Sequence, residues 1–188
     1  MTQTAGDQDV VDILTADHQE VMHLIAEIWV TADPQQRRDL ADTVISELVR
    51  HSVAEEMYVY PAMKEHLADG AEAVDHDVAE HKEIEATLKG LESADPADAS
   101  FNELLRKLEA TLRDHIDDEE TEQFPGLRAS IPHETLVEIG QKVESAKKLA
   151  PTRPHPLAPN NEVFHKLVGP GVGLVDRLRD KLTGRSTG

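Results

Sequence analysis

A pattern of histidine and glutamate residues occurs twice in this 188-residue chain. His18 and His81 lie 63 positions apart within similar stretches, Ala-Asp-His-Gln-Glu-Val and Ala-Glu-His-Lys-Glu-Ile. A second segment, His-x-x-x-Glu-Glu followed by an aromatic residue and proline, starts at His51 and again at His115, 64 positions later. An internal repeat of this kind constrains the fold more strongly than composition does. It predicts two similar units, each a helical hairpin.

Apolar residues at alternating spacings of three and four predict helices with one buried face. Such stripes cover residues 9–30, a stretch from the Asp33-Pro34 start signal through Pro61, residues 70–91, and a stretch that begins at Asp98 or Ser100. Pro61 is expected to kink the second helix. Only 3% of the residues are aromatic, and the loops are short. The sequence therefore predicts an all-α protein, an antiparallel up-down four-helix bundle with an additional C-terminal helix and tail.

The chain is expected to divide into three segments. Residues 1–131 form the bundle, and residues 132–150 form an accessory helix that packs against its outside. Residues 151–188 contain a Pro/Gly-rich linker and a short, basic, amphipathic tail. Two alternatives remain open for this tail: it is disordered, or Val175, Leu178 and Leu182 dock on the acidic bundle. Its protein partner is unknown from the sequence.

Charge and composition exclude several classes of partner and cofactor. The formal net charge of −18 disfavours nucleic acid and anionic membrane surfaces, because both are negatively charged. The chain has no cysteine, which excludes disulfides, thiolate ligands and iron–sulfur clusters. Its N-terminal residues are polar and acidic, and no apolar run approaches the roughly 20 residues that span a bilayer. We therefore expect a cytoplasmic protein in which nitrogen and oxygen atoms bind any metal.

Six polar residues of the repeat fall on the buried stripes of the predicted helices. Unpaired burial would cost several kcal/mol for each of them, and coordination of metal ions would remove that cost. The spacing of four residues places His and Glu about 6 Å apart on one helix face. Three ligands from each hairpin suit two metal ions, so the predicted ligands are His18, His51, Glu55, His81, His115 and Glu119. A metal-free His–Glu hydrogen-bond network, or a different helix phase, remains an alternative.

The ligand types restrict the metal without selecting it. Imidazole and carboxylate ligands fit iron or manganese, tolerate zinc, and are too rich in nitrogen for calcium or magnesium. On these residues the chain resembles the hemerythrin-like, or HHE cation-binding, family over roughly residues 10–125. The resemblance implies a non-haem di-iron centre with an oxo or hydroxo bridge, in which Glu55 and Glu119 bridge or cap the irons.

The chain departs from the oxygen-carrying hemerythrins on the third helix, where those proteins have a His-x-x-x-His pair. Here Asp77 stands four residues before His81, and His76 stands five before it. His76 is therefore about 140° around an ideal helix, and a surface or supporting role is favoured over a role as an extra ligand. Tyr58 lies three residues after Glu55, so its phenol is a candidate to donate to bound peroxide or oxygen or to ligate iron. The alternative is a core tyrosine without a role at the metal.

The remaining polar residues carry weaker signals. Glu56 and Glu120 fall beside the ligand stripe, where they would support a ligand or face solvent. Five histidines outside the pattern are expected at the surface: His23, His66, His133, His155 and His165.

The leading functional hypothesis is a di-iron enzyme that decomposes hydrogen peroxide in a catalase-like reaction. The resemblance also allows nitric oxide chemistry at the same centre. A different class of function is a module that binds or senses dioxygen, nitric oxide or iron, with the tail passing on the change. Iron delivery or cluster repair is a third interpretation. The ligands alone do not separate these functions.

Overall fold

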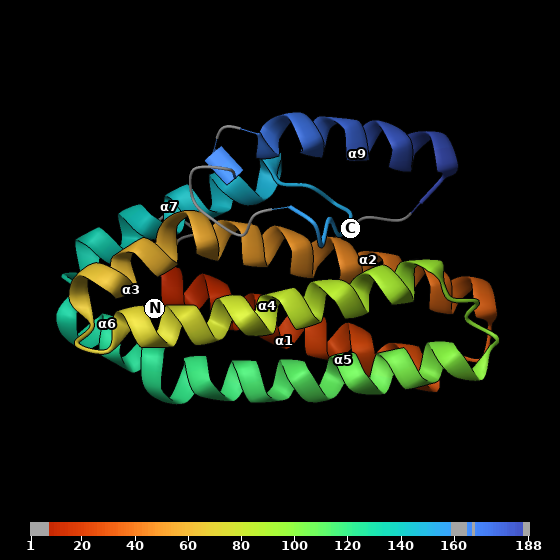
Figure 1. Ribbon diagram of the computed structural model, residues 1–188, viewed down its shortest axis with the longest axis horizontal. Helices are drawn as coiled ribbons and strands as arrows, with labels where there is room; N and C mark the ends of the chain where they lie inside the picture. The colour runs from red at the N-terminus through yellow and green to blue at the C-terminus, as the bar shows by residue number, and fades with distance from the viewer. Residues whose placement is uncertain (1–7, 159–164, 167, 186–188) are drawn as a thin grey trace.

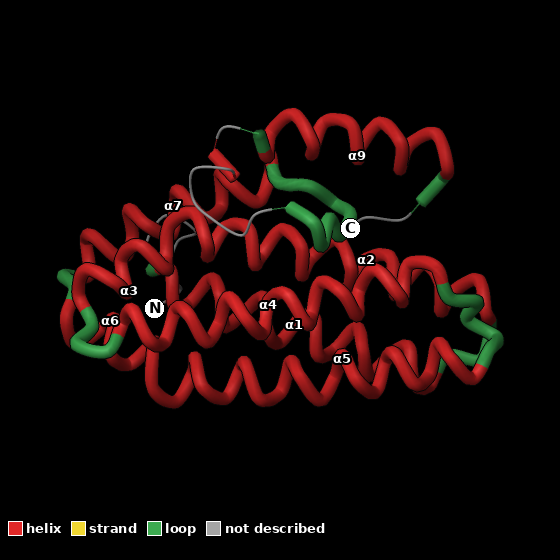
Figure 2. The backbone as a smooth tube through the Cα atoms, in the orientation of Figure 1, coloured by secondary structure: helices red, strands yellow, loops and turns green. Residues whose placement is uncertain are grey.

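A computed structural model of the chain describes residues 8–158, 165–166 and 168–185, and these residues form helices and loops without strands (Figure 2). The four long bundle helices alternate in direction along the chain, so each runs antiparallel to the one before it (Figure 1). This arrangement confirms the predicted all-α bundle. No helix in the described ranges combines the length and apolar character needed to cross a membrane. The bundle helices are α1 (Val10–Val30), α2 (Pro34–Ala54), α4 (Gly70–Ser93) and α5 (Ala99–Asp118).

Local signals in the sequence explain where the first two helices begin. The carboxylate of Asp9 accepts a hydrogen bond from the backbone N–H of Asp12 at 2.9 Å and so caps α1. Asp33 caps α2 in the same way, and Pro34 occupies the first turn, where its missing N–H costs nothing. Gly70 begins α4 close to the preceding helix, where an added Cβ would lie 2.0 Å from the carbonyl oxygen of Met63. Only glycine fits that turn.

Two helices of the bundle each contain one wider turn directly after the predicted ligands. α2 continues through the π-helical turn η1 (Glu55–Val59) into α3 (Tyr60–His66). In the second half, α5 continues through η2 (Glu119–Gln123) into α6 (Phe124–Ser130). The backbone N–H of Tyr60 bonds the carbonyl of Glu55, five residues earlier. The proline after each turn lacks an N–H, and a π turn accommodates it with one extra residue.

The core consists of two apolar clusters with a polar layer between them. One cluster, toward α3 and α6, includes Leu14, Val53, Met57, Val74 and Phe124. The other, toward the α1–α2 and α4–α5 loops, includes Val21, Leu48, Ile84, Phe101 and Leu112. The four histidines of the repeat lie between these clusters along their helices, so the six predicted ligands occupy a layer sealed by apolar side chains on both sides.

Helix α7 (His133–Leu149) packs against α1 and α2. Leu136, Ile139, Val143 and Ala146 of its inner face belong to the first apolar cluster. Its polar edge also reaches the bundle, because Lys147 Nζ donates to both carboxylate oxygens of Asp17 at 2.6 and 2.8 Å. The accessory helix is therefore part of the core and contacts the polar layer.

Helix α9 (Gly169–Thr183) differs from both alternatives predicted for the tail. It lies against the rest of the chain through Asp176 and Asp180, which are buried, while Val175, Leu178 and Leu182 are exposed. Figure 1 shows α9 along the side of the bundle near α2 and α7. Ion pairs rather than apolar burial hold it there, so an amphipathic pattern alone pointed to the wrong face.

Candidate metal centre

The structure brings the six predicted ligands together in the polar layer of the bundle. Each is at most 5% exposed, and they come from four different helices or their π turns. Their nitrogen and oxygen atoms form two groups in which all atoms lie within 4.8 Å of one another. The first group contains His18, His51, Glu55 and Glu119, and the second contains Glu55, His81 and His115.

The two glutamates each face one imidazole from each half of the repeat. Glu55 Oε1 lies 3.2 Å from His51 Nε2, and Glu55 Oε2 lies 3.4 Å from His81 Nε2. Glu119 Oε2 lies 3.2 Å from His18 Nε2, and Glu119 Oε1 lies 3.6 Å from His115 Nε2. Both carboxylates therefore span the gap between the His18/His51 pair and the His81/His115 pair.

Several of these atoms have no hydrogen-bond partner although they are fully buried. Within the described residues, this applies to both carboxylate oxygens of Glu55, Nε2 of His115 and Oε2 of Glu119. His18 Nε2 and His51 Nε2 face each other at 3.2 Å. Donors bound to one ion at ~2.1 Å lie roughly 3.0 to 3.4 Å apart, which matches these contacts. The donor set therefore fits metal cations with nitrogen and oxygen ligands.

A ring of outer carboxylates holds the imidazoles in this orientation. Each carboxylate accepts a hydrogen bond from Nδ1 of one histidine, which leaves Nε2 directed at the centre. The contacts repeat in the two halves, because Asp17 corresponds to Glu80 and Glu120 to Glu56. The pairs are His18 with Glu120 at 2.9 Å, His51 with Asp17 at 3.2 Å, His81 with Glu56 at 3.0 Å and His115 with Glu80 at 2.8 Å.

The carboxylates make the cluster strongly attractive to positive charge. Burial disfavours the charged form of His81, but the carboxylates of Glu55, 3.4 Å away, and of Glu56, its hydrogen-bond partner, raise its pKa to about 10. Burial opposes the charged form of His51 as well, and the charge of Glu55 together with the bond to Asp17 still raises its pKa well above the usual value. Without a metal these sites favour protons, and the same negative charges favour a bound cation.

An aromatic residue covers one histidine in each half of the cluster. The ring of Phe124 stacks on His18, with centroids 5.8 Å apart and planes 8° apart. Tyr60 takes the corresponding place beside His81, and its phenol oxygen lies 3.0 Å from His81 Nε2. Burial and the nearby carboxylates, Glu55 first among them, raise the pKa of Tyr60 well above its usual value. The phenol therefore keeps its proton inside the cluster.

Tyr58, the aromatic residue predicted to act at the metal, does not lie there. Its ring is half-buried beneath Lys166, whose Nζ is 4.7 Å from the ring centroid. The prediction assumed that residues three apart share a face, as they do in an α-helix. In the π turn that follows Glu55, the fifth residue returns to that face instead. Tyr60 is therefore the tyrosine at the cluster.

His76, the predicted extra ligand, also lies elsewhere. Its side chain is 58% exposed, and its Nε2 faces Glu80 at 3.5 Å and Asp118 at 3.6 Å on the surface. Its position five residues before His81 on a regular α-helix explains this outward direction. Asp77, four residues before His81, is fully buried and accepts a hydrogen bond from Gln123 at 3.0 Å.

One contact with these carboxylates comes from a histidine that was predicted to be at the surface. His165 is 7% exposed, and its Nε2 lies 2.8 Å from Glu56 Oε2. No spacing within the repeat could reveal it, because its position depends on how the tail returns to the bundle. The outer carboxylates had a signal, since an acidic residue precedes His18 and His81 in both copies of the repeat.

The space next to the histidines is small. A cavity of about 10 Å³ is lined by the four histidines, by Asp17 and Ser52, and by apolar residues. This volume is close to that of a single water-sized sphere. Only very small molecules fit beside the cluster without movement of the helices.

Known proteins are similar to this chain over most of its length. The profile of the hemerythrin HHE cation binding domain matches residues 9–127. An uncharacterized hemerythrin-like protein of Schizosaccharomyces pombe is 30% identical over 174 residues, which cover 92% of this chain and 86% of that protein. A DNA nickase of Nostoc is 26% identical over 149 residues, 78% of this chain but only 42% of the nickase.

A solved structure shows the same fold. The crystal structure of a hemerythrin HHE cation binding domain-containing protein from Mycobacterium kansasii superposes with a TM-score of 0.65. The match covers 75% of this chain and 86% of that one, at 21% identity. At this identity the likeness concerns the fold alone.

Proposed function

Because this chain belongs to the hemerythrin HHE cation-binding family, we propose that its buried cluster holds two iron ions and that the protein decomposes hydrogen peroxide. The observation that carries the proposal is the position of Glu55 and Glu119. Each places one oxygen next to the His18/His51 pair and the other next to the His81/His115 pair. Carboxylates in that position are suited to link two cations.

The ligand set supports iron over most other metals. Four imidazoles and two carboxylates without sulfur are suited to iron and manganese, while zinc remains chemically possible. The carboxylates add negative charge, which favours the ferric state and so favours redox turnover over reversible oxygen binding. Two irons that exchange electrons with peroxide are therefore the proposed cofactor.

The size of the site supports a small substrate. The cavity beside the four histidines has a volume of about 10 Å³, so peroxide, dioxygen and nitric oxide are the appropriate class of molecule. Peroxide is favoured because Tyr60 holds a protonated phenol next to Nε2 of His81, one of the four histidines that line this cavity. Cleavage of an O–O bond needs protons for the departing oxygen, and a buried phenol can hold and deliver one.

Each protein group has a defined role in the proposed reaction. Bound iron would supply electron exchange, so that one peroxide is reduced to two waters while a second is oxidised to dioxygen. The outer carboxylates keep the imidazole Nε2 atoms directed inward. Tyr60 holds a proton beside His81, and the apolar clusters on both sides exclude bulk water. The reaction balances without an external electron donor.

Oxygen release from peroxide tests the proposal. Full-length protein is loaded with ferrous iron, desalted and analysed for iron, and dioxygen is then measured after peroxide is added. We expect about one dioxygen for every two peroxides consumed, at a rate well above that of the same concentration of free iron. A rate no higher than that of free iron would exclude peroxide decomposition as the function.

A binding or sensing function is the second candidate, and one observation favours it. Glu56, which contacts His81, also contacts His165 of the C-terminal segment. A change at the metal could therefore be passed to the outer segment. Under this alternative, iron-loaded protein would bind dioxygen or nitric oxide reversibly, seen as a reversible change in its optical spectrum, without consuming peroxide.

A further inference from the structure

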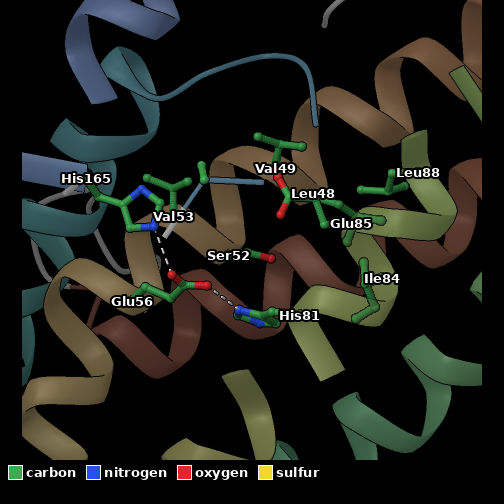
Figure 3. Close-up of a pocket in the computed structure, with 11 residues that line it drawn as sticks. Leu48, Val49, Ser52, Val53, Glu56, His81, Ile84, Glu85, Leu88 and His165 are labelled. Carbon is green, nitrogen blue, oxygen red and sulfur yellow. Dashed lines mark hydrogen bonds and ion pairs between the residues drawn. The ribbon is translucent and has the colours of Figure 1, made fainter. Parts of the chain in front are cut away.

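Glu56 joins the buried cluster to the C-terminal segment. Its Oε1 accepts a hydrogen bond from His81 Nδ1 at 3.0 Å, and its Oε2 accepts one from His165 Nε2 at 2.8 Å. Figure 3 shows this carboxylate between the two imidazoles, with one dashed line to each. Glu56 is itself only 4% exposed. Both of its oxygens are therefore occupied inside the protein rather than by bulk water.

The other half of the repeat lacks this arrangement. Glu120 holds His18 Nδ1 at 2.9 Å in the position that corresponds to Glu56. Its side chain is 35% exposed, so water can solvate its second oxygen. The His81 side of the cluster is thus supported by a tail residue, whereas the His18 side is supported by a carboxylate at the surface.

Ion pairs fix the described part of the C-terminal segment against the bundle. Arg153 contacts Asp180 at 2.6 Å and Glu92 of α4 at 2.7 Å. Arg185 contacts Asp42 of α2 at 3.3 Å. These pairs link α9 and the linker to two helices of the bundle.

We propose that His165 is a positioning residue of the metal centre: it holds Glu56 against His81 and so retains the metal ion bound by His81 and His115. The inference rests on the proposed occupancy by two ions. It assigns the C-terminal segment a direct role in metal retention on one side of the cluster. A histidine whose Nδ1 is held by a fixed carboxylate is a better ligand, because its ring orientation and its tautomer are both set.

The space around Glu56 explains what loss of His165 would do. A cavity of about 30 Å³ lies beside Glu56, His81, Ser52 and His165. It has room for a water molecule, and a shortened side chain at position 165 would enlarge it. Glu56 would then turn toward that water, and His81 would lose the partner that fixes its Nε2 toward the metal. Only the metal ion at the His81/His115 pair should be held less tightly.

Iron release to a chelator tests this inference without measuring turnover. Iron-loaded full-length protein is mixed with excess ferrozine and a reductant, and the coloured complex is followed over time. The variants are His165→Ala, His165→Gln, whose amide can still donate to Glu56, and His155→Ala. His155 is the matched control, because it contacts Asp176 of the same segment at 2.9 Å and does not contact Glu56.

The proposal predicts that His165→Ala releases half of its iron about 10- to 100-fold faster than wild type, with the other half unchanged. His165→Gln should restore most of the retention, and His155→Ala should stay within about twofold of wild type. Release of both halves at wild-type rates by His165→Ala would overturn the proposal. If His155→Ala accelerated iron release as much as His165→Ala, the proposal would also be overturned. The C-terminal segment would then retain iron only by shielding the site from solvent.

The outcome separates this inference from the proposed function. One possible result is that the protein binds two irons, that His165→Ala accelerates the release of one of them, and that peroxide yields no oxygen. This result would support the role of His165 and reject peroxide decomposition. Peroxide decomposition by wild type, with identical iron release from wild type and His165→Ala, would do the reverse.

Discussion

The phenol oxygen of Tyr60 lies 3.0 Å from Nε2 of His81, at a position where the other half of the repeat has Phe124. The two halves otherwise match closely, with one aromatic ring beside one histidine in each. The hydroxyl therefore makes the cluster chemically asymmetric. It supplies a proton donor on the His81 side only.

Replacing Tyr60 by phenylalanine should slow peroxide decomposition by about a hundredfold, because the proton donor is lost while ring packing is kept. Iron content should stay at the wild-type value, since the phenol is not a proposed ligand. Iron analysis and oxygen release on the same preparation measure both effects.

Tyr58→Phe is the matched control for that experiment. Tyr58 is two residues away but lies beneath Lys166, so both iron content and rate should be unchanged. A slow Tyr58→Phe variant with a normal Tyr60→Phe variant would reverse the assignment of the two tyrosines.

Tyr58 and Tyr60 show which parts of the site could be predicted from the sequence. The repeat and the helical stripes predicted the bundle and the six residues that converge, because the spacing of ligands before Glu55 follows a regular α-helix. The same rule could not predict which residue after Glu55 returns to the ligand face of the helix, since the π turn adds a residue. The proline at Pro61 was the available signal, and it was interpreted as a kink.

Substitution of single ligands should distinguish a residue that binds both metal ions from a residue that binds only one. His81→Ala should reduce bound iron toward one ion per chain, because His81 serves only one of the two groups. Glu55→Ala should remove most of both ions, because its oxygens face both groups. Iron analysis combined with circular dichroism checks the result, with helix content expected to remain near wild type. Equal iron in the two variants would contradict the shared position of Glu55.

Lys147 of α7 should influence the metal through Asp17. Its Nζ lies 2.6 Å from Asp17 Oδ1, and Asp17 holds His51 Nδ1. Lys147→Met frees Asp17 to move, so iron affinity at the His18/His51 pair should fall by about tenfold. Lys148→Met is the control, because Lys148 is exposed on the same helix. Competition with a chelator of known affinity measures both variants, and equal affinities would remove Lys147 from the account.

Asp9 should stabilise the fold in a way that depends on pH. Burial raises its pKa, but hydrogen bonds from Arg128 and the backbone N–H of Asp12, with the charges of Arg128 and of His133 at 3.8 Å, lower it below the usual value. A lowered pKa means that its contribution is present above about pH 4 and is lost as the pH falls through the lower, folded-state value. Acid should therefore weaken this link between α1 and α6.

Urea unfolding of chelator-treated protein measures that contribution. At pH 7, Asp9→Ala should lower the free energy of unfolding by about 2 kcal/mol, through loss of the cap and the ion pair. Asp9→Asn keeps the cap and should cost about 1 kcal/mol at most, because Arg128 is partly exposed. The Asn variant and wild type should converge as the pH falls toward 3. A constant difference down to pH 3 would show that the charge of Asp9 contributes nothing.

The tail marks the limit of prediction from pattern. Residues of α9 follow an amphipathic rhythm, and such a rhythm normally indicates that the apolar face is buried. Here Asp180 pairs with Arg153, and Asp176 pairs with His155, all within the C-terminal segment. These ion pairs turn the polar edge of α9 inward. Pairing between distant residues is a property of the folded chain, so the contact between His165 and Glu56 could not be predicted either.

Anomalous diffraction at the iron absorption edge, from crystals of the iron-loaded protein, tests whether the cluster holds two irons. We expect two iron peaks in the polar layer, both touched by Glu55 and Glu119, with His18 and His51 at one and His81 and His115 at the other. A single peak, or peaks outside this layer, would rule out a di-iron centre at these residues.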